Sequence, residues 1–165
     1  MLLRLLALAL ALMACGRDAA GPSWAGPALQ LIAERSSKAP RDQHGLLDRF
    51  YGLQDLDHDG IFEVLETVPH YEGRGEFMNV ELAPAFEWVS VFQYQDGAYR
   101  EATEVFRSFL NGRRAHYELW LRLVQSPSSL SPDSQGLVRA NRDEFLAVLR
   151  EYIRRIEKHL AERAG

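Results

Sequence analysis

The residues of this chain that are best suited to chemistry are the acidic side chains between Asp55 and Glu66. Their spacing is regular, with three aspartates at alternate positions, then one glycine, then two glutamates: Asp55, Asp57, Asp59, Gly60, Glu63 and Glu66. Calcium takes six to eight oxygen ligands at about 2.3–2.6 Å, and alternate carboxylates on a curving loop can point toward one centre. The spacing matches the pattern D-x-[DN]-x-[DN]-G-x5-E and predicts one bound calcium ion.

The positions within this loop have separate physical roles. Gly60 permits a sharp turn, and Ile61 can offer its backbone carbonyl while its own side chain stays apolar. The residues that follow, 64–68, are poor helix formers and end at a proline, so the loop is expected to join two strands. On a strand, Glu63 and Glu66 point to opposite faces, which makes Glu63 the better ligand. The alternative is an acidic turn capped by its own backbone amides.

The stretch DLDHDGIFEVLE, residues 55–66, resembles the calcium-binding loop of FG-GAP/VCBS-type repeats, which occur in integrin-like propeller blades. The later stretch EWVSVFQYQDGAYREAT is similar to the way these repeats continue, so the resemblance covers residues 50–103. It implies ligands from Asp55, Asp57, Asp59, the Ile61 carbonyl and Glu63. A propeller needs several blades and this chain has one such unit, so the adhesion roles of full propellers do not transfer.

The N-terminus predicts export and lipid attachment. One arginine precedes a short apolar run, which is shorter than the roughly 20 residues of a membrane-spanning helix. The run ends in Leu-Met-Ala-Cys, which resembles a bacterial lipobox, and Cys15 is the only cysteine. We therefore expect residues 1–14 to be a lipoprotein signal peptide and Cys15 to be lipidated, with Gly16 favouring the outer membrane, facing the periplasm. The alternative is an ordinary cleaved signal with a chance cysteine.

The rest of the chain predicts one α+β domain over residues 28–165, joined to the lipid by a flexible tether over 15–27. Helical spacing predicts a helix over 28–38 and two C-terminal helices, with a possible break at Asn111-Gly112. Apolar and β-branched runs predict strands over 61–68, 87–94 and 98–100, and Asp96-Gly97 predicts a hairpin turn. Residues 45–54 fit a helix or a strand, and we favour a helix followed by a strand from about Tyr51. The expected fold is a small antiparallel β-meander packed against these helices.

Composition and patterns narrow the function classes. The net charge of −4 gives no basic footprint for nucleic acid. No pattern of a nucleophile, a phosphate loop or a zinc site is present. We therefore expect a non-enzymatic, lipid-anchored envelope protein that binds calcium and an unknown protein or glycan partner. The alternative is a small envelope hydrolase acting on cell-wall or glycan material, with Glu66 or Glu72 beside the metal. His70 and Glu72 are either part of a second metal site or a solvated loop pair.

Overall fold

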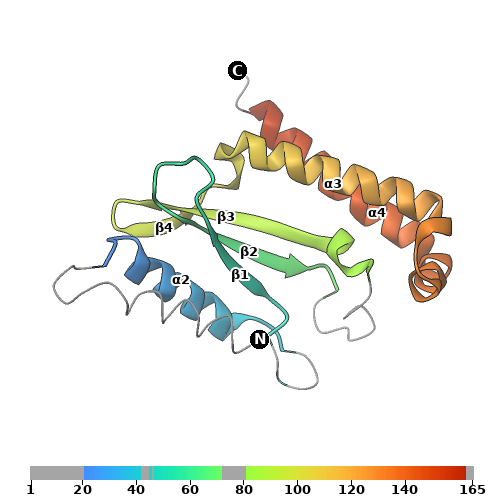
Figure 1. Cartoon of the computed structure of the whole chain (residues 1–165), viewed down its shortest axis with the longest axis horizontal. Coiled ribbons are helices and arrows are strands. Elements are labelled where there is room, and N and C mark those ends of the chain that lie inside the picture. The colour runs from blue at the N-terminus through green and yellow to red at the C-terminus, as the bar shows by residue number, and fades with distance from the viewer. Residues whose placement is uncertain (1–20, 42–44, 46, 72–80, 163–165) are drawn as a thin grey trace.

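The computed structural model describes residues 21–41, 45, 47–71 and 81–162, and within them the chain is an α+β fold. One helix comes first, a four-stranded sheet follows, and two longer helices end the described chain (Figure 1). The expected fold class is therefore confirmed. The elements are α2 (Ala25–Lys38), β1 (Phe50–Gln54), β2 (Glu63–Pro69), β3 (Glu87–Gln95), β4 (Ala98–Glu101), α3 (Arg107–Gln125) and α4 (Pro132–Glu162).

The sheet is an antiparallel meander in the order β1-β2-β3-β4, so each strand pairs with its neighbour in the chain. The hairpin between β3 and β4 has the two-residue loop that the sequence predicts. Asp96 and Gly97 both have positive φ, 52° and 85°, which is the requirement of a type I′ turn. The helix favoured before Tyr51 is wrong for the described part of that segment, because Phe50 already begins strand β1.

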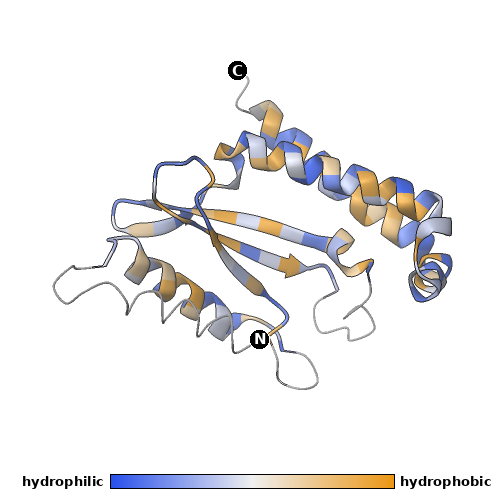
Figure 2. Cartoon of the chain, viewed as in Figure 1, coloured by the Kyte–Doolittle hydropathy of each residue, from blue (hydrophilic) through white to orange (hydrophobic). Residues whose placement is uncertain are grey.

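Helices lie on both sides of the sheet, with α2 on one side and the α3–α4 hairpin on the other (Figure 1). Successive residues of a strand point to opposite faces, and β2 uses both. Val64 packs with Phe92 of β3 and with Ala28 of α2. Leu65 packs with the buried Phe106, which directly precedes α3. The loop between β1 and β2 is hydrophilic, as Figure 2 shows, and lies at the end of the sheet near the start of α3.

The largest core cluster joins α3 and α4. Helix α4 contributes Phe145, Leu149, Tyr152 and Ile156 to this cluster, and the partly buried Leu160 packs against it. Helix α3 continues through Asn111-Gly112 without a break. Helix α4 has a kink at Asn141 (φ −130°, ψ 22°), whose side-chain amide donates to the Leu137 carbonyl.

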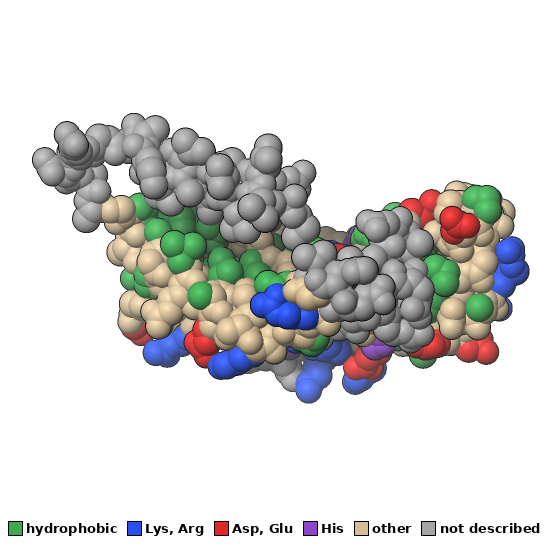
Figure 3. Space-filling model, turned by 90° about the horizontal axis from the view of Figure 1, so that it is seen from below, with side chains coloured by type: hydrophobic (Ala, Val, Ile, Leu, Met, Phe, Trp, Pro, Cys, Tyr) green, Lys and Arg blue, Asp and Glu red, His purple; other side chains and the backbone are tan. Residues whose placement is uncertain are grey.

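Helix α2 begins at Ala25, three residues before the expected start, so Ala25–Pro27 belong to the helix and not to the tether. Just before it, Trp24 stacks on Phe62 of the acidic loop with ring centroids 5.3 Å apart. Leu29 of α2 is exposed, and Figure 3 shows hydrophobic side chains gathered on the face seen from below. Among the described helices, none combines the length and the apolar character needed to cross a bilayer.

Candidate metal site

The acidic loop connects β1 to β2 and is folded by its own hydrogen bonds. The Gly60 amide donates to Asp55 Oδ2 at 3.2 Å, and the Ile61 amide donates to Asp59 Oδ1 at 2.7 Å. Gly60 has φ 83°, a left-handed conformation that is open to glycine, and His58 has φ 64°. The sharp turn expected at the sixth position of the loop is therefore present.

Three carboxylates converge at the base of this loop. One oxygen from each of Asp55, Asp57 and Glu63 lies within 4.8 Å of the other two. Gln54 and Glu63 pair directly as the last residue of β1 and the first of β2, which brings the two ends of the loop together. These three residues can hold a metal ion.

The buried oxygen atoms of the group support this assignment. Glu63 is 1% exposed, and its Oε2 accepts a hydrogen bond from the Leu56 amide at 2.8 Å. Its Oε1 is buried and accepts no hydrogen bond from any described residue, and the same holds for Oδ1 of Asp55. A buried carboxylate oxygen without a partner costs free energy, and a cation beside it would offset that cost. The donor set therefore fits a cation that prefers oxygen ligands.

The electrostatics of Glu63 follow from the same geometry. Burial raises the pKa of the Glu63 carboxyl above its ordinary value, and the negative charges of Asp57 and Asp59 raise it further. The hydrogen bond from the Leu56 amide opposes this shift without cancelling it. A bound cation would favour the ionised form of Glu63. The acidic loop is also linked to β4, because the Tyr99 hydroxyl donates to the Phe62 carbonyl at 2.6 Å.

Glu66, the twelfth position of the loop, lies elsewhere. It projects from β2 toward α2 and is 1% exposed. Its Oε2 accepts from Arg35 of α2 at 2.5 Å, and its Oε1 accepts from Arg49 at 3.3 Å and from the Tyr51 hydroxyl at 3.0 Å. Burial alone would raise the pKa of Glu66, but the hydrogen bond and charge of Arg35, aided by Tyr51 and Arg49, lower it below the ordinary value. We call Glu66 with these three partners the Glu66 clasp.

The structure therefore separates the two glutamates, one on each face of β2, as their strand parity predicts. Glu63 joins Asp55 and Asp57, whereas Glu66 contacts cations of the protein itself. Asp59 lies outside the three-carboxylate group and bonds to the backbone of Ile61. The Glu66 clasp was missed in the sequence, because Arg35 is 31 positions away. The sequence signal for this contact was the strand parity of Glu66, which places its carboxylate on the face of β2 that a helix covers.

Other candidate residues are placed as follows. The ring of His70 lies edge-on to Tyr71, with centroids 4.8 Å apart, and near Tyr152 of α4. Cys15 and Glu72 lie outside the described residues. Comparison of the chain with protein-family models, with curated proteins and with solved structures finds no match.

Proposed function

We propose that this chain is a non-enzymatic calcium-binding protein of the bacterial cell envelope, anchored by lipid at Cys15. The observation that carries the metal part is the buried, unpartnered Oε1 of Glu63 beside Asp55 and Asp57. In water a carboxylate oxygen is solvated, so burying one without a partner is favourable only when something positive replaces the solvent.

Calcium is favoured over other divalent ions by the ligand chemistry. All the candidate donors are oxygens, whereas structural zinc sites in proteins are built from cysteine and histidine. Magnesium demands near-ideal octahedral geometry and keeps several waters, and so rarely uses an all-protein cage. The alternate aspartates with Gly60 form a flexible oxygen cage of the kind that calcium accepts. We expect the ligands to be Asp55, Asp57, Glu63, the Ile61 carbonyl and Asp59 after a small rotation of its side chain.

A bound calcium ion would stabilise the β1–β2 end of the sheet. It neutralises carboxylates that otherwise repel one another, and it ties the end of β1 to the start of β2, where Gln54 pairs with Glu63. An interaction surface formed by this loop would then be more stable with calcium bound. A hydrolase that uses Glu66 as its acid is disfavoured, because that carboxyl has a lowered pKa and three partners.

The location rests on the N-terminal sequence. A positive residue, a short apolar run and the Leu-Met-Ala-Cys ending support cleavage before Cys15 and attachment of acyl chains. Several acyl chains supply the stable anchoring that a single chain does not. We propose an outer-membrane protein that faces the periplasm, and its partner there, a protein or a glycan, is not a nucleic acid because the chain carries net negative charge.

The test is calcium titration of the mature chain by calorimetry, together with thermal unfolding in chelator and in calcium. We expect one ion per chain and a stabilisation of about 2.7 kcal/mol at a hundredfold excess over the dissociation constant. Asp55→Asn should abolish the response, and Glu63→Gln should weaken it more than Glu66→Gln. Asp96→Asn, in the β3–β4 turn, is the matched control and should respond normally. Absence of any calcium-induced shift in the unmutated chain refutes the site.

A further inference from the structure

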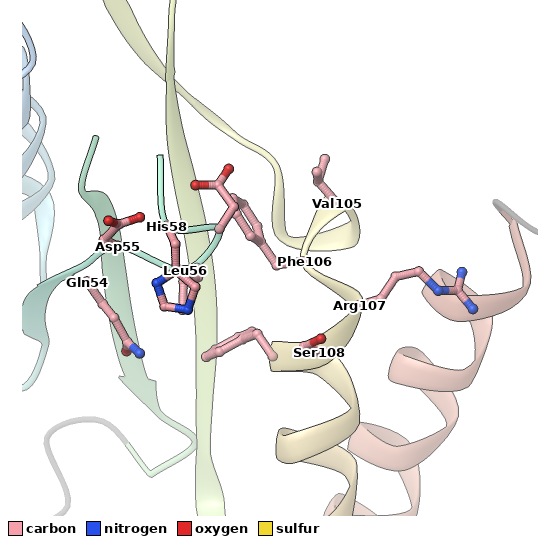
Figure 4. Close-up of a pocket in the computed structure, with 10 residues that line it drawn as sticks. Gln54, Asp55, Leu56, His58, Val105, Phe106, Arg107 and Ser108 are labelled. Atoms are coloured by element: carbon pink, nitrogen blue, oxygen red, sulfur yellow. The ribbon is translucent and has the colours of Figure 1, made fainter. Parts of the chain in front are cut away.

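A groove of about 570 Å³ opens beside the acidic loop. One wall is formed by residues 54–58 of the loop and the other by residues 105–109, at the start of α3 (Figure 4). Ligand sites in proteins typically have volumes of about 300–1,000 Å³, so the groove can receive a small ligand. The two walls come from segments about fifty positions apart, and the groove therefore exists only in the folded domain.

Besides Asp55, Asp57 and Arg107, the lining combines apolar side chains with hydrogen-bonding ones. Leu56 and Phe109 contribute apolar surface, while Gln54, His58 and Ser108 contribute an amide, an imidazole and a hydroxyl. The guanidinium of Arg107 turns away from the loop and donates to the Leu160 carbonyl of α4 at 3.1 Å (Figure 4). Its charge is therefore not directed into the groove. The start of α3 has no side-chain cap, so its first backbone amides are additional donors at this wall.

The groove and the metal group share two residues. Asp55 and Asp57 belong to the three-carboxylate group and also line the groove. Calcium takes six to eight oxygens, and the five expected ligands, Asp55, Asp57, Asp59, Glu63 and the Ile61 carbonyl, supply five of them when each gives one oxygen. Because Asp55 and Asp57 also line the groove, we expect a ligand oxygen bound there to reach a coordination position that the protein leaves open.

The net charge of the carboxylates and the bound ion determines which class of ligand the groove can bind. Asp55, Asp57 and Glu63 contribute −3 when ionised, so a calcium ion leaves −1, and Asp59 nearby makes the region more negative. An anionic ligand is therefore repelled by the groove wall, and a cation would compete with the ion itself. A neutral ligand with adjacent hydroxyls meets every requirement, because hydroxyl oxygens can coordinate calcium and also donate or accept hydrogen bonds.

We propose that the groove binds a neutral carbohydrate, whose ring packs against Phe109 and whose adjacent hydroxyls complete the coordination of the bound calcium. This inference rests on the proposed calcium site. A sugar ring has an apolar C–H face that suits an aromatic side chain, and hydroxyl edges that suit the amide of Gln54 and the imidazole of His58. The amide, imidazole and hydroxyl groups match hydroxyls better than they match an apolar peptide side chain.

The test is saturation-transfer NMR on the mature chain with mannose, galactose, glucose and N-acetylglucosamine, in millimolar calcium and then in chelator. We expect signals from at least one of these sugars in calcium and none in chelator. Galacturonate should give a weaker signal than the best neutral sugar. Calorimetry on the same samples reports calcium binding, so the two proposals fail separately. Bound calcium with no sugar signal overturns only the carbohydrate inference, whereas absence of bound calcium overturns both.

Two substitutions on α3 locate the ligand. Ser108→Trp places an indole in the groove and should weaken sugar binding at least tenfold while calcium binding stays unchanged. Leu119→Trp, at a position of the same helix that is 47% exposed and outside the groove lining, is the matched control. Equal loss in both variants, or no loss in Ser108→Trp, overturns the location. Phe109→Ala is less informative, because Phe109 also packs against the core cluster of Phe106.

Discussion

Replacing Glu66 by glutamine tests the assignment of this residue to the clasp and not to the metal site. The substitution keeps the shape of the side chain and one carbonyl acceptor, but it removes the negative charge between Arg35 and Arg49. If the clasp interpretation is correct, the domain loses stability in chelator, and the stabilisation by calcium is unchanged. If Glu66 were the principal twelfth-position ligand of a helical calcium loop, the calcium effect would be lost instead.

The expected loss of stability in Glu66→Gln depends on how deeply each partner of the ion pair is buried. Breaking a fully buried ion pair costs about 3–5 kcal/mol, because the remaining charge has no partner. Glu66 is 1% exposed, but the side chains of Arg35 and Arg49 are 35% and 22% exposed and can recover water. Glutamine also retains an acceptor for the Tyr51 hydroxyl. We therefore expect a loss of about 2 kcal/mol, below the buried-pair range and within that of a charge-assisted hydrogen bond. For a domain of this size this lowers the melting temperature by roughly 8 °C.

The assay is thermal and urea unfolding followed by circular dichroism, in chelator and in calcium. Glu34→Gln is the matched control, because Glu34 pairs with Lys38 on the exposed face of helix α2, which also carries Arg35, and exposed pairs contribute little to stability. A double-mutant cycle with Arg35→Met should show coupling between Arg35 and Glu66. The clasp interpretation is refuted if Glu66→Gln is as stable as the Glu34→Gln variant, or if it abolishes the calcium effect.

Three further predictions concern the pH dependence of stability, two glycines and the lipid anchor. The pKa of Glu66 is lower in the folded state than its ordinary value of 4.5, so its stabilisation is present above that value and is lost as the pH falls through the folded pKa; acid titration of stability in chelator should therefore be shallower for Glu66→Gln. Gly97→Ala should cost about 1–2 kcal/mol in urea unfolding because of φ 85°, whereas Gly112→Ala, in the middle of α3, should stabilise by up to about 1 kcal/mol. Cys15→Ser should move the protein from the membrane fraction to the aqueous fraction, and retention in the membrane with unchanged mass contradicts the lipid anchor.

Much of the sheet was predictable because its signals are local. Asp96-Gly97 requires positive φ at adjacent positions, and few structures other than a type I′ hairpin accept that. The spacing from Asp55 to Glu63 likewise fixes a loop within nine residues. The strand parity of Glu63 and Glu66 needed only the prediction of a strand, and the sequence supplied it through Pro69 and the β-branched residues.

The features that were missed depend on contacts between distant segments. Arg35 and Glu66 are 31 positions apart, and nothing near either residue indicates the other. The early start of α2 is accompanied by the stacking of Trp24 on Phe62, which is also a tertiary contact. The kink at Asn141 occurs inside a sequence with ordinary helical spacing, where a side-chain amide bonds to a backbone carbonyl in the preceding turn. Periodicity alone cannot reveal such features.

The sparse burial of α2 has a consequence for the native-state fluctuations of this domain. Ala28 is its single fully buried residue, whereas α3 and α4 together bury a large apolar cluster. Regions with few buried apolar contacts open at a lower free energy than the global unfolding transition. Backbone amides of α2 should therefore exchange with solvent through a local opening in which the sheet and the helical hairpin stay folded. In that open form Arg35 no longer covers the Glu66 carboxylate and the Phe92 ring. The Arg35 contact therefore also limits how often this face of the sheet is exposed to solvent.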